Sequence, residues 1–403
     1  MSNALVGQSG GPTVAINASL AGVIEGVIGT SKIDKIYGSI HGITGILEDR
    51  VIELNDTFKD NENLDLLCAT PAMYLKSCRY RLKEKDMALL VAKLQKYDIK
   101  YFFYIGGNDS MDTVMKLNAY IKEHNIDIVA MGIPKTIDND LAVTDHCPGF
   151  GSAAKYVATT VCEVARDCFI YNPKTIVILE IMGRNAGWLT AAAALARCKN
   201  MTAPHYIYLP ERAFDIDKFL ADMKEGLDKY NHVIVAVSEG IKDKDGKYIA
   251  ESSLIGKEDS FGHSQLGGVA KVLEGYVKEK LQVKCRGIEI NVLQRSASHL
   301  ASATDITEAR TIGRKAVEFA LNGESGKMMT YKRISSEPYK ITYEASDING
   351  IANAEKTVPD EYINDKGNNV TNEFIKYARP LIIGQAKQYE KNGMPVHLSL
   401  YKG

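Results

Sequence analysis

The sequence has 403 residues, 45% of them hydrophobic, which is enough to bury one large α/β core or two medium ones. Its 49 basic and 50 acidic side chains give a formal net charge of -1, so no overall field attracts nucleic acid or an anionic membrane. The N-terminus lacks the basic and apolar regions of a signal peptide, and no stretch approaches the ~20 apolar residues of a membrane span. Seven scattered cysteines without a C-x-x-C pair indicate neither a disulfide framework nor a zinc site. We therefore expect a two-domain cytoplasmic protein with no nucleic-acid or membrane partner.

The first expected strand ends in the turn "GQSGGPT", and a helix should open near Pro12 or Thr13. Glycines let the backbone approach a bound oxyanion, and a helix N-terminus offers free N–H groups and a partial positive charge. The same glycines also suit a tight strand-to-helix turn that binds nothing. From this turn alone, phosphate binding and a purely structural role both remain open.

A second strand ends in the turn "IGGNDS", residues 105–110. Asp109 or Ser110 could simply cap the helix that follows. Alternatively, the oxygens of Asn108 and Asp109 could bind Mg²⁺ beside phosphate groups, because Mg²⁺ prefers carboxylate, carbonyl and water ligands.

The third turn, "IPKTIDND", places Lys135, Asp138 and Asp140 directly after an apolar run. A hydroxyl that attacks a phosphoryl group needs a base for its proton and cations for the charge on the transferred group. This set of side chains therefore favours phosphoryl transfer. An Asx-rich turn with a surface lysine is the competing interpretation.

Further along the chain, "MGRNAGW" supplies Arg184, "SEG" supplies Glu239, and "CRGIEINVLQRS" supplies Arg286 and Arg295. Each arginine could form an ordinary surface ion pair. The apolar runs before these turns, however, are followed by helical periodicity, which indicates parallel βαβ units. Their polar turns should share the carboxyl edge of a sheet, where ligands bind in such folds.

No repeat, low-complexity segment or long linker marks a domain boundary. The stretch "TDHCPGFGS" interrupts the pattern, so we expect one α/β domain over residues 1–145 and a second over 146–325. Residues 326–403 should form a C-terminal extension that packs on the domains. Within it, residues 328–350 alternate like a hairpin and residues 372–391 are expected to include a helix.

Six motifs together resemble the phosphofructokinase family over about residues 1–300: "GQSGGPT", "GGNDS", "PKTIDND", "MGRNAGW", "SEG" and "QRS". Within that family the chain looks like the pyrophosphate-dependent branch. The resemblance implies an α/β fold of two similar Rossmann-like domains with mainly parallel sheets and the active site in the cleft between them. It also implies reversible transfer of a phosphoryl group from pyrophosphate to the C1 hydroxyl of fructose 6-phosphate, in glycolysis or gluconeogenesis, with Mg²⁺ or Mn²⁺.

The same resemblance assigns roles by position. Asp138 resembles the general base, and Arg184 and Arg79 look like the arginines that steady the transferred group. Donor binding is implied for Gly11, Arg79, Gly107, Asn108, Asp109, Ser110 and Lys135, with Asn108 and Asp109 as metal ligands. Sugar-phosphate binding is implied for Thr136, Asp138, Asp140, Met182, Gly183, Arg184, Glu239, Arg286 and Arg295. Because the family lends Arg286 from a neighbouring subunit, a homodimer or homotetramer is expected.

Two positions indicate the donor. Relatives that use ATP have glycine where this sequence has Asp109 and Lys135. A carboxylate at 109 would repel a nucleotide α-phosphate, and a lysine at 135 would neutralise charge on a small donor without adenosine. The alternatives are an ATP-dependent 6-phosphofructokinase or related sugar-phosphate kinase and a non-catalytic sugar-phosphate-sensing subunit, although a sensor need not retain a base.

Several positions depart from the family pattern. A metal-binding aspartate is replaced by Asn108, and Thr175 and Val292 replace residues expected near the sugar phosphate. His263 resembles a structural histidine of the pyrophosphate-dependent branch. Ala21 and Glu25 stand where allosteric bacterial relatives have effector-binding arginines, so we expect no nucleotide regulation of that kind.

Overall fold

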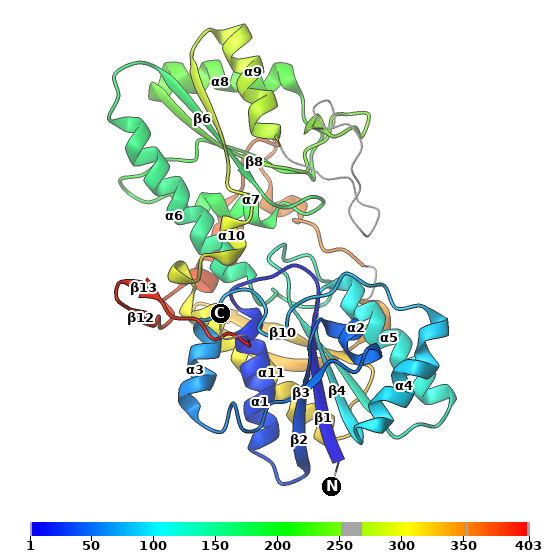
Figure 1. The fold of residues 1–403 in the computed structure, drawn as a ribbon. Coiled ribbons are helices and arrows are strands. Elements are labelled where there is room, and N and C mark those ends of the chain that lie inside the picture. Colours follow the sequence, from blue (N-terminus) through cyan, green and yellow to red (C-terminus); the bar gives the residue numbers. More distant parts are fainter. Residues whose placement is uncertain (1, 251–267, 352–353, 401–403) are drawn as a thin grey trace.

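The computed structural model describes residues 2–250, 268–351 and 354–400. The chain forms two large sheets of mainly parallel strands, one above the other in Figure 1. The lower sheet has the strand order β11-β10-β5-β4-β1-β2-β3. Its strands are β1 (Ser2–Gln8), β2 (Ile33–Ser39), β3 (Val51–Glu53), β4 (Ile99–Gly106), β5 (Val129–Pro134), β10 (Lys327–Ser336) and β11 (Tyr339–Asp347). Only β3 and β11 pair antiparallel to their neighbours. The central strands β1, β4 and β5 are buried almost throughout, as expected when helices cover both faces of a parallel sheet.

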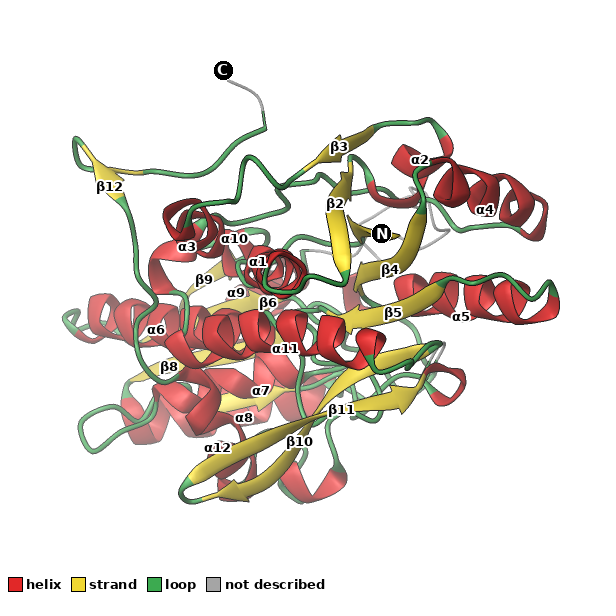
Figure 2. Ribbon diagram, turned by 90° about the horizontal axis from the view of Figure 1, so that it is seen from below, coloured by secondary structure: helices red, strands yellow, loops and turns green. Residues whose placement is uncertain are grey.

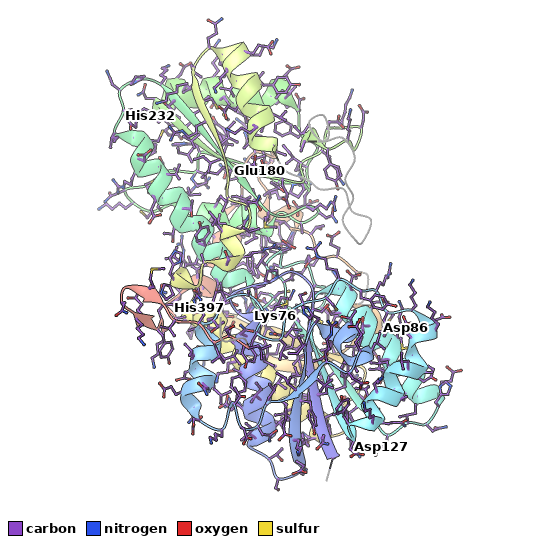
Figure 3. The ribbon with its side chains drawn as sticks, viewed as in Figure 1. Lys76, Asp86, Asp127, Glu180, His232 and His397 are labelled. Atoms are coloured by element: carbon purple, nitrogen blue, oxygen red, sulfur yellow. The ribbon has the colours of Figure 1, made fainter. Side chains whose placement is uncertain are left out.

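The upper sheet has the order β7-β8-β6-β9, with all pairs parallel. Its strands are β6 (Thr175–Ile181), β7 (Tyr206–Tyr208), β8 (His232–Ser238) and β9 (Lys284–Glu289). Glu180 on β6, labelled in Figure 3, accepts hydrogen bonds from the backbone N–H groups of Gly268 and Ala270 at 3.1 and 2.8 Å. These bonds attach the start of a helix to the sheet.

Helices surround both sheets. Those of the lower unit are α1 (Ile16–Ile28), α2 (Gly42–Leu47), α3 (Asn61–Ala69), α4 (Met87–Lys96), α5 (Asn108–Glu123) and α11 (Ala303–Leu321). Those of the upper unit are α6 (Phe150–Phe169), α7 (Trp188–Ala192), α8 (Ile216–Tyr230), α9 (Val269–Leu281) and α10 (Leu293–Ser296). Among the described residues, no helix is long and apolar enough to cross a membrane.

The division at residue 325 does not follow the packing. Helix α11, expected in the second domain, lies along α1 in the lower unit, and its Ile312 and Ala316 share a core with Ala4 and Val6 of β1. Strand β10, expected in an extension, pairs in parallel with β5 and continues the lower sheet. The chain therefore returns to the first unit after completing the second, which sequence order alone does not reveal.

The expected C-terminal hairpin is confirmed as β10 and β11, which Figure 2 shows along one side of the lower sheet. The expected helix is shorter than residues 372–391, since α12 covers only Asn372–Ala378. A 3₁₀ turn then begins at Arg379, because Pro380 cannot continue an α-helix, and Gly384 has a positive φ of 75°. The remaining residues run as loop except for the short pair β12 (Glu390–Lys391) and β13 (Met394–Pro395).

The crossing of α1 and α11 predicts a steric effect on stability. A Cβ at Gly22 would lie 1.9 Å from the carbonyl oxygen of Arg310, so Gly22→Ala should lower the free energy of unfolding by about 1–3 kcal/mol. Gly275→Ala is the matched control, because nothing lies within 4 Å of its Cβ position on helix α9. That variant should be neutral or stabilised by about 0.4–1 kcal/mol. Denaturant unfolding of both measures the difference, and equal stabilities would contradict the close helix crossing.

Candidate active site

The carboxyl ends of β1, β4 and β5 face the upper unit (Figure 1) and surround a cavity of about 480 Å³. The predicted site residues that line it are Gly11, Arg79, Gly107, Asn108, Asp109, Ser110, Lys135, Thr136, Asp138 and Asp140. Polar turns that are up to 130 residues apart thus meet at one sheet edge, as the alternation of strands and helices predicts.

The glycine turn after β1 packs against the side chain of Lys135. Gly10 has a φ of 82°, and a Cβ there would lie 3.0 Å from Lys135 Nζ, which donates a hydrogen bond to the carbonyl oxygen of Gly11 at 2.6 Å. Helix α1 begins at Ile16, later than the expected Pro12 or Thr13. Thr13 Oγ1 instead accepts hydrogen bonds from the N–H groups of Ala15 and Ile16 at 3.2 and 3.0 Å. The two hydrogen bonds to Thr13 Oγ1 close the turn directly before the helix starts.

The turn after β4 does not use its polar side chains as caps. Gly107 is the N-cap of α5, no side chain bonds the helix terminus, and Asp109 is exposed in the cavity wall. Asn108 Nδ2 donates to Asp140 Oδ2 at 3.5 Å, while Asn108 Oδ1 is buried and has no hydrogen-bond partner among the described residues. The capping interpretation is therefore wrong, and an unused oxygen remains beside the cavity.

Lys135 is not a surface lysine, since only 3% of it is exposed. Burial lowers its pKa to about 8, against the opposing attraction of Asp138 and Asp140. Burial also raises the pKa of Asp138 to about 7, with further increases from repulsion by Asp140 and Glu239. The pKa of Asp140 is raised by burial as well. A buried cation thus lies near two carboxyl groups with raised pKa values, that of Asp138 being about 7, an arrangement suited to proton transfer.

The predicted residues of the upper unit lie on interlocked turns. Asn185 of these turns lines the 480 Å³ cavity, whereas the described lining does not include Met182, Gly183, Arg184, Glu239 or Arg295. Glu239 Oε1 accepts a hydrogen bond from the N–H of Gly183 at 3.2 Å, and Gly240 packs so closely that a Cβ would lie 1.8 Å from the carbonyl oxygen of Arg184. The N–H of Met182 donates to Gln294 Oε1 at 3.3 Å. The neighbouring Arg295 reaches the lower unit, since its Nη1 lies 3.4 Å from the Cβ position of Gly11.

Arg286 lies apart from these residues. It is exposed on the edge strand β9 and lines a separate cavity of about 250 Å³ together with Thr175. In the described part of the chain, Arg286 is not among the residues that line the 480 Å³ cavity.

Sequence reasoning missed several lining residues, namely Tyr80, Thr113, Asn185, Ala354 and Glu355. Asn185 belongs to the quoted "MGRNAGW" motif, so the motif already carried its signal. Ala354 and Glu355 come from the C-terminal segment, where no motif marks them. His263 falls outside the described residues.

Another cavity, of about 510 Å³, lies beside α1, α3 and α11 and is lined by Glu25, Asp65 and Arg310. Arg310 is already paired there with Glu25 at 3.0 Å and with Asp65 at 2.8 Å. Its charge is thus compensated by the protein, whereas the 480 Å³ cavity gathers Lys135, Arg79 and acidic side chains along strand ends.

The residues present fit a divalent cation that a ligand helps to hold. No group of three or more His, Cys, Asp or Glu side chains is placed to bind a metal anywhere in residues 2–250, 268–351 and 354–400. Asn108 Oδ1 is nevertheless an unpartnered oxygen, and Asp109 follows it at the cavity wall. Mg²⁺ commonly rests on one or two protein oxygens and completes its shell with phosphate oxygens and water.

Comparison with known proteins agrees with this geometry. The sequence model of the phosphofructokinase family matches residues 3–320 of this chain. The chain belongs to the phosphofructokinase family.

Its relatives in that family extend over the whole chain. A protein of Xanthomonas campestris pv. campestris named pyrophosphate–fructose 6-phosphate 1-phosphotransferase is 43% identical, over 99% of this chain and 96% of its own. A Halomonas elongata protein of the same name is 40% identical over the same shares. The crystal structure of the pyrophosphate-dependent phosphofructokinase from Marinobacter aquaeolei has a TM-score of 0.89 and 36% identity, covering 98% of this chain and 95% of the other. The family resemblance and the α/β fold class expected from the motifs are confirmed.

Proposed function

We propose that this phosphofructokinase transfers a phosphoryl group from pyrophosphate to the C1 hydroxyl of fructose 6-phosphate. The bond between the bridging oxygen and one phosphorus breaks, a bond from the C1 oxygen to that phosphorus forms, and phosphate leaves. The observation that carries the proposal is buried Lys135, held between the glycine turn and two acidic residues at the cavity. Its charge suits a compact, highly charged donor. The names of the full-length relatives support the same reaction.

In this reaction Asp138 accepts the proton of the C1 hydroxyl. A base with a pKa near the working pH combines a useful unprotonated fraction with a useful proton affinity. Arg79 and Arg184 balance charge on the transferred group, and Thr136, Asp140, Met182, Gly183, Glu239 and Arg295 surround the sugar phosphate. A bound Mg²⁺ would rest on Asn108 and Asp109 and would neutralise charge on the donor.

We further propose that the protein works as a homo-oligomer in the cytoplasm. Arg286 is exposed on an edge strand and outside its own chain's main cavity, so a second copy of the chain would have to supply it. All seven cysteines are free thiols, which suits a reducing compartment.

The direct test is an assay of the purified protein with fructose 6-phosphate and Mg²⁺, comparing pyrophosphate with ATP. Turnover with pyrophosphate should exceed turnover with ATP. Turnover with ATP alone would overturn the proposed donor, and none with either would overturn the reaction.

The base assignment predicts a pH dependence and a kinetic loss. Because the pKa of Asp138 is raised to about 7 and the unprotonated form is active, kcat/KM should rise as pH increases through about 7. Asp138→Asn should lower kcat by ~10² to 10⁴ with substrate binding largely retained. Steady-state kinetics from about pH 5.5 to about pH 9, roughly 1.5 to 2 units on either side of this pKa, would measure both effects. A variant with near-normal kcat would show that Asp138 is not the base.

Donor choice is tested by a double-mutant cycle at positions 109 and 135. Asp109→Gly should raise kcat/KM for ATP, because it removes a carboxylate from the cavity wall. Lys135→Met, which keeps the buried volume, should cost ~1 to 3 kcal/mol of transition-state stabilisation with pyrophosphate. Since both side chains would face the same donor phosphates, the two effects should be non-additive. No gain with ATP together with unchanged pyrophosphate kinetics would assign both residues to the loop's structure.

The metal assignment predicts cooperative binding with the donor. Mn²⁺ alone should bind weakly, because the described residues hold no cluster of three acidic, His or Cys ligands, and pyrophosphate should strengthen binding. Asn108→Leu should weaken Mn²⁺ binding in the presence of pyrophosphate by about tenfold or more, whereas Asn108→Asp should strengthen it. Paramagnetic resonance of free Mn²⁺ reports these affinities without turnover. Equal affinities in all three proteins would remove Asn108 from the metal site.

A further inference from the structure

Lys356 is a cation that no family motif includes and that lies beyond the matched residues 3–320. Its side chain is half-buried, with the ammonium nitrogen turned inward. Lys356 Nζ donates hydrogen bonds to the carbonyl oxygens of Thr144 and Asp145 at 3.0 and 2.9 Å. Nζ also lies 5.1 Å from the ring centroid of Trp188. A charge removed from water in this way is costly unless it is bonded, so its contacts define its role.

The backbone around Lys356 touches both halves of the active site. Its N–H donates to the carbonyl oxygen of Asp140 at 2.7 Å, and the preceding Glu355 forms a β-bridge with Leu141. On the other side, Trp188 Nε1 donates to the carbonyl oxygen of Lys356 at 2.8 Å. This short segment therefore joins the loop that carries Asp138 to the turn that carries Arg184.

The upper-unit attachment continues two residues later. Glu211 Oε1 accepts hydrogen bonds from the N–H groups of Val358 at 2.9 Å and Gly187 at 2.8 Å. The segment is thus fixed to the "MGRNAGW" turn at two separate points.

The loop that Lys356 holds has a strained backbone. Asn139 has a φ of 56°, and Val143, a β-branched residue, has a φ of 70°. Such conformations persist where surrounding contacts determine them. The carbonyls of Thr144 and Asp145, which directly follow Val143, are the ones that Lys356 bonds, so its ammonium group secures the end of the strained stretch.

We propose that Lys356 is a positioning residue that holds the loop of residues 138–145 so that Asp138 faces the acceptor hydroxyl opposite Arg184. The proposal rests on the function proposed above. A displacement of about 1 Å at reacting groups can cost about 100-fold in rate, which makes a second anchor on this loop valuable.

The test is Lys356→Met, which keeps the side chain's length and removes its charge and donors. We expect kcat to fall about 10- to 100-fold, while KM for pyrophosphate changes less than about threefold, because the hydrogen bonds of Lys356 Nζ go to Thr144 and Asp145 rather than to the proposed donor-binding residues. Lys356→Arg retains donors for both carbonyls and should recover part of kcat.

Lys155→Met is the matched control. Lys155 Nζ donates to the carbonyl oxygen of Gly384 at 2.6 Å, so it also ties the C-terminal segment to the body of the protein, but through α6 rather than through the 138–145 loop. It should keep wild-type kcat. Melting temperatures of both variants show whether each loss exceeds a general loss of stability.

The outcomes separate the two proposals. A wild-type protein without phosphotransfer refutes the proposed function. An active wild type whose folded Lys356→Met variant keeps normal kcat, or loses no more than Lys155→Met, refutes the role of Lys356. Should Lys356→Met fail to fold, Tyr377→Phe probes the same loop, since Tyr377 Oη donates to the carbonyl oxygen of Asp145 at 2.7 Å. Unchanged kcat in that variant would also overturn the proposal.

Discussion

The hydrogen bond from Lys135 Nζ to the carbonyl of Gly11 is the interaction on which the site depends. It joins the ends of β5 and β1, and it places an ammonium group where water is largely excluded. Such a charge must be matched, and the carboxylates of Asp138 and Asp140 favour the charged form of Lys135, while burial raises the pKa values of both aspartates. The electrostatics of Lys135, Asp138 and Asp140 are therefore one coupled system rather than separate features.

The second constraint is that the site is assembled from two units. Arg295 and Asn185 approach from the upper unit, and the strand-end turns approach from the lower unit. The chain crosses between the units and returns, so α11 and β10 build the lower unit while residues 354–358 touch both. Because these connections are distributed along the sequence, the relative placement of the two units at the candidate site depends on residues far from any motif.

The sequence predicted the strand-end turns well, because each is a short apolar run followed by glycine or aspartate, and these patterns are local. The sequence did not reveal that Lys135 is buried rather than on the surface, because the burial of this side chain depends on the glycine turn more than 120 residues away. The sequence analysis assigned α11 to the second domain, whereas the helix packs in the lower unit, because an amphipathic pattern does not reveal which sheet a helix covers. The contacts of Lys356 could not be predicted either, because they arise from a segment without glycine turns or alternation.

The pairing of β10 with β5 determines what a truncated chain would lose. The family-matched region ends at residue 320, yet a chain cut there would lose β10 and β11 and leave the N–H and C=O groups of β5 on an open edge. Buried Tyr331 and Met329 would leave the core beside α11 at the same time. An uncovered strand edge next to an exposed apolar surface is a template for association between chains. Strands β10 and β11 thus cover the edge of β5 and the core beside α11 as well as extending the sheet.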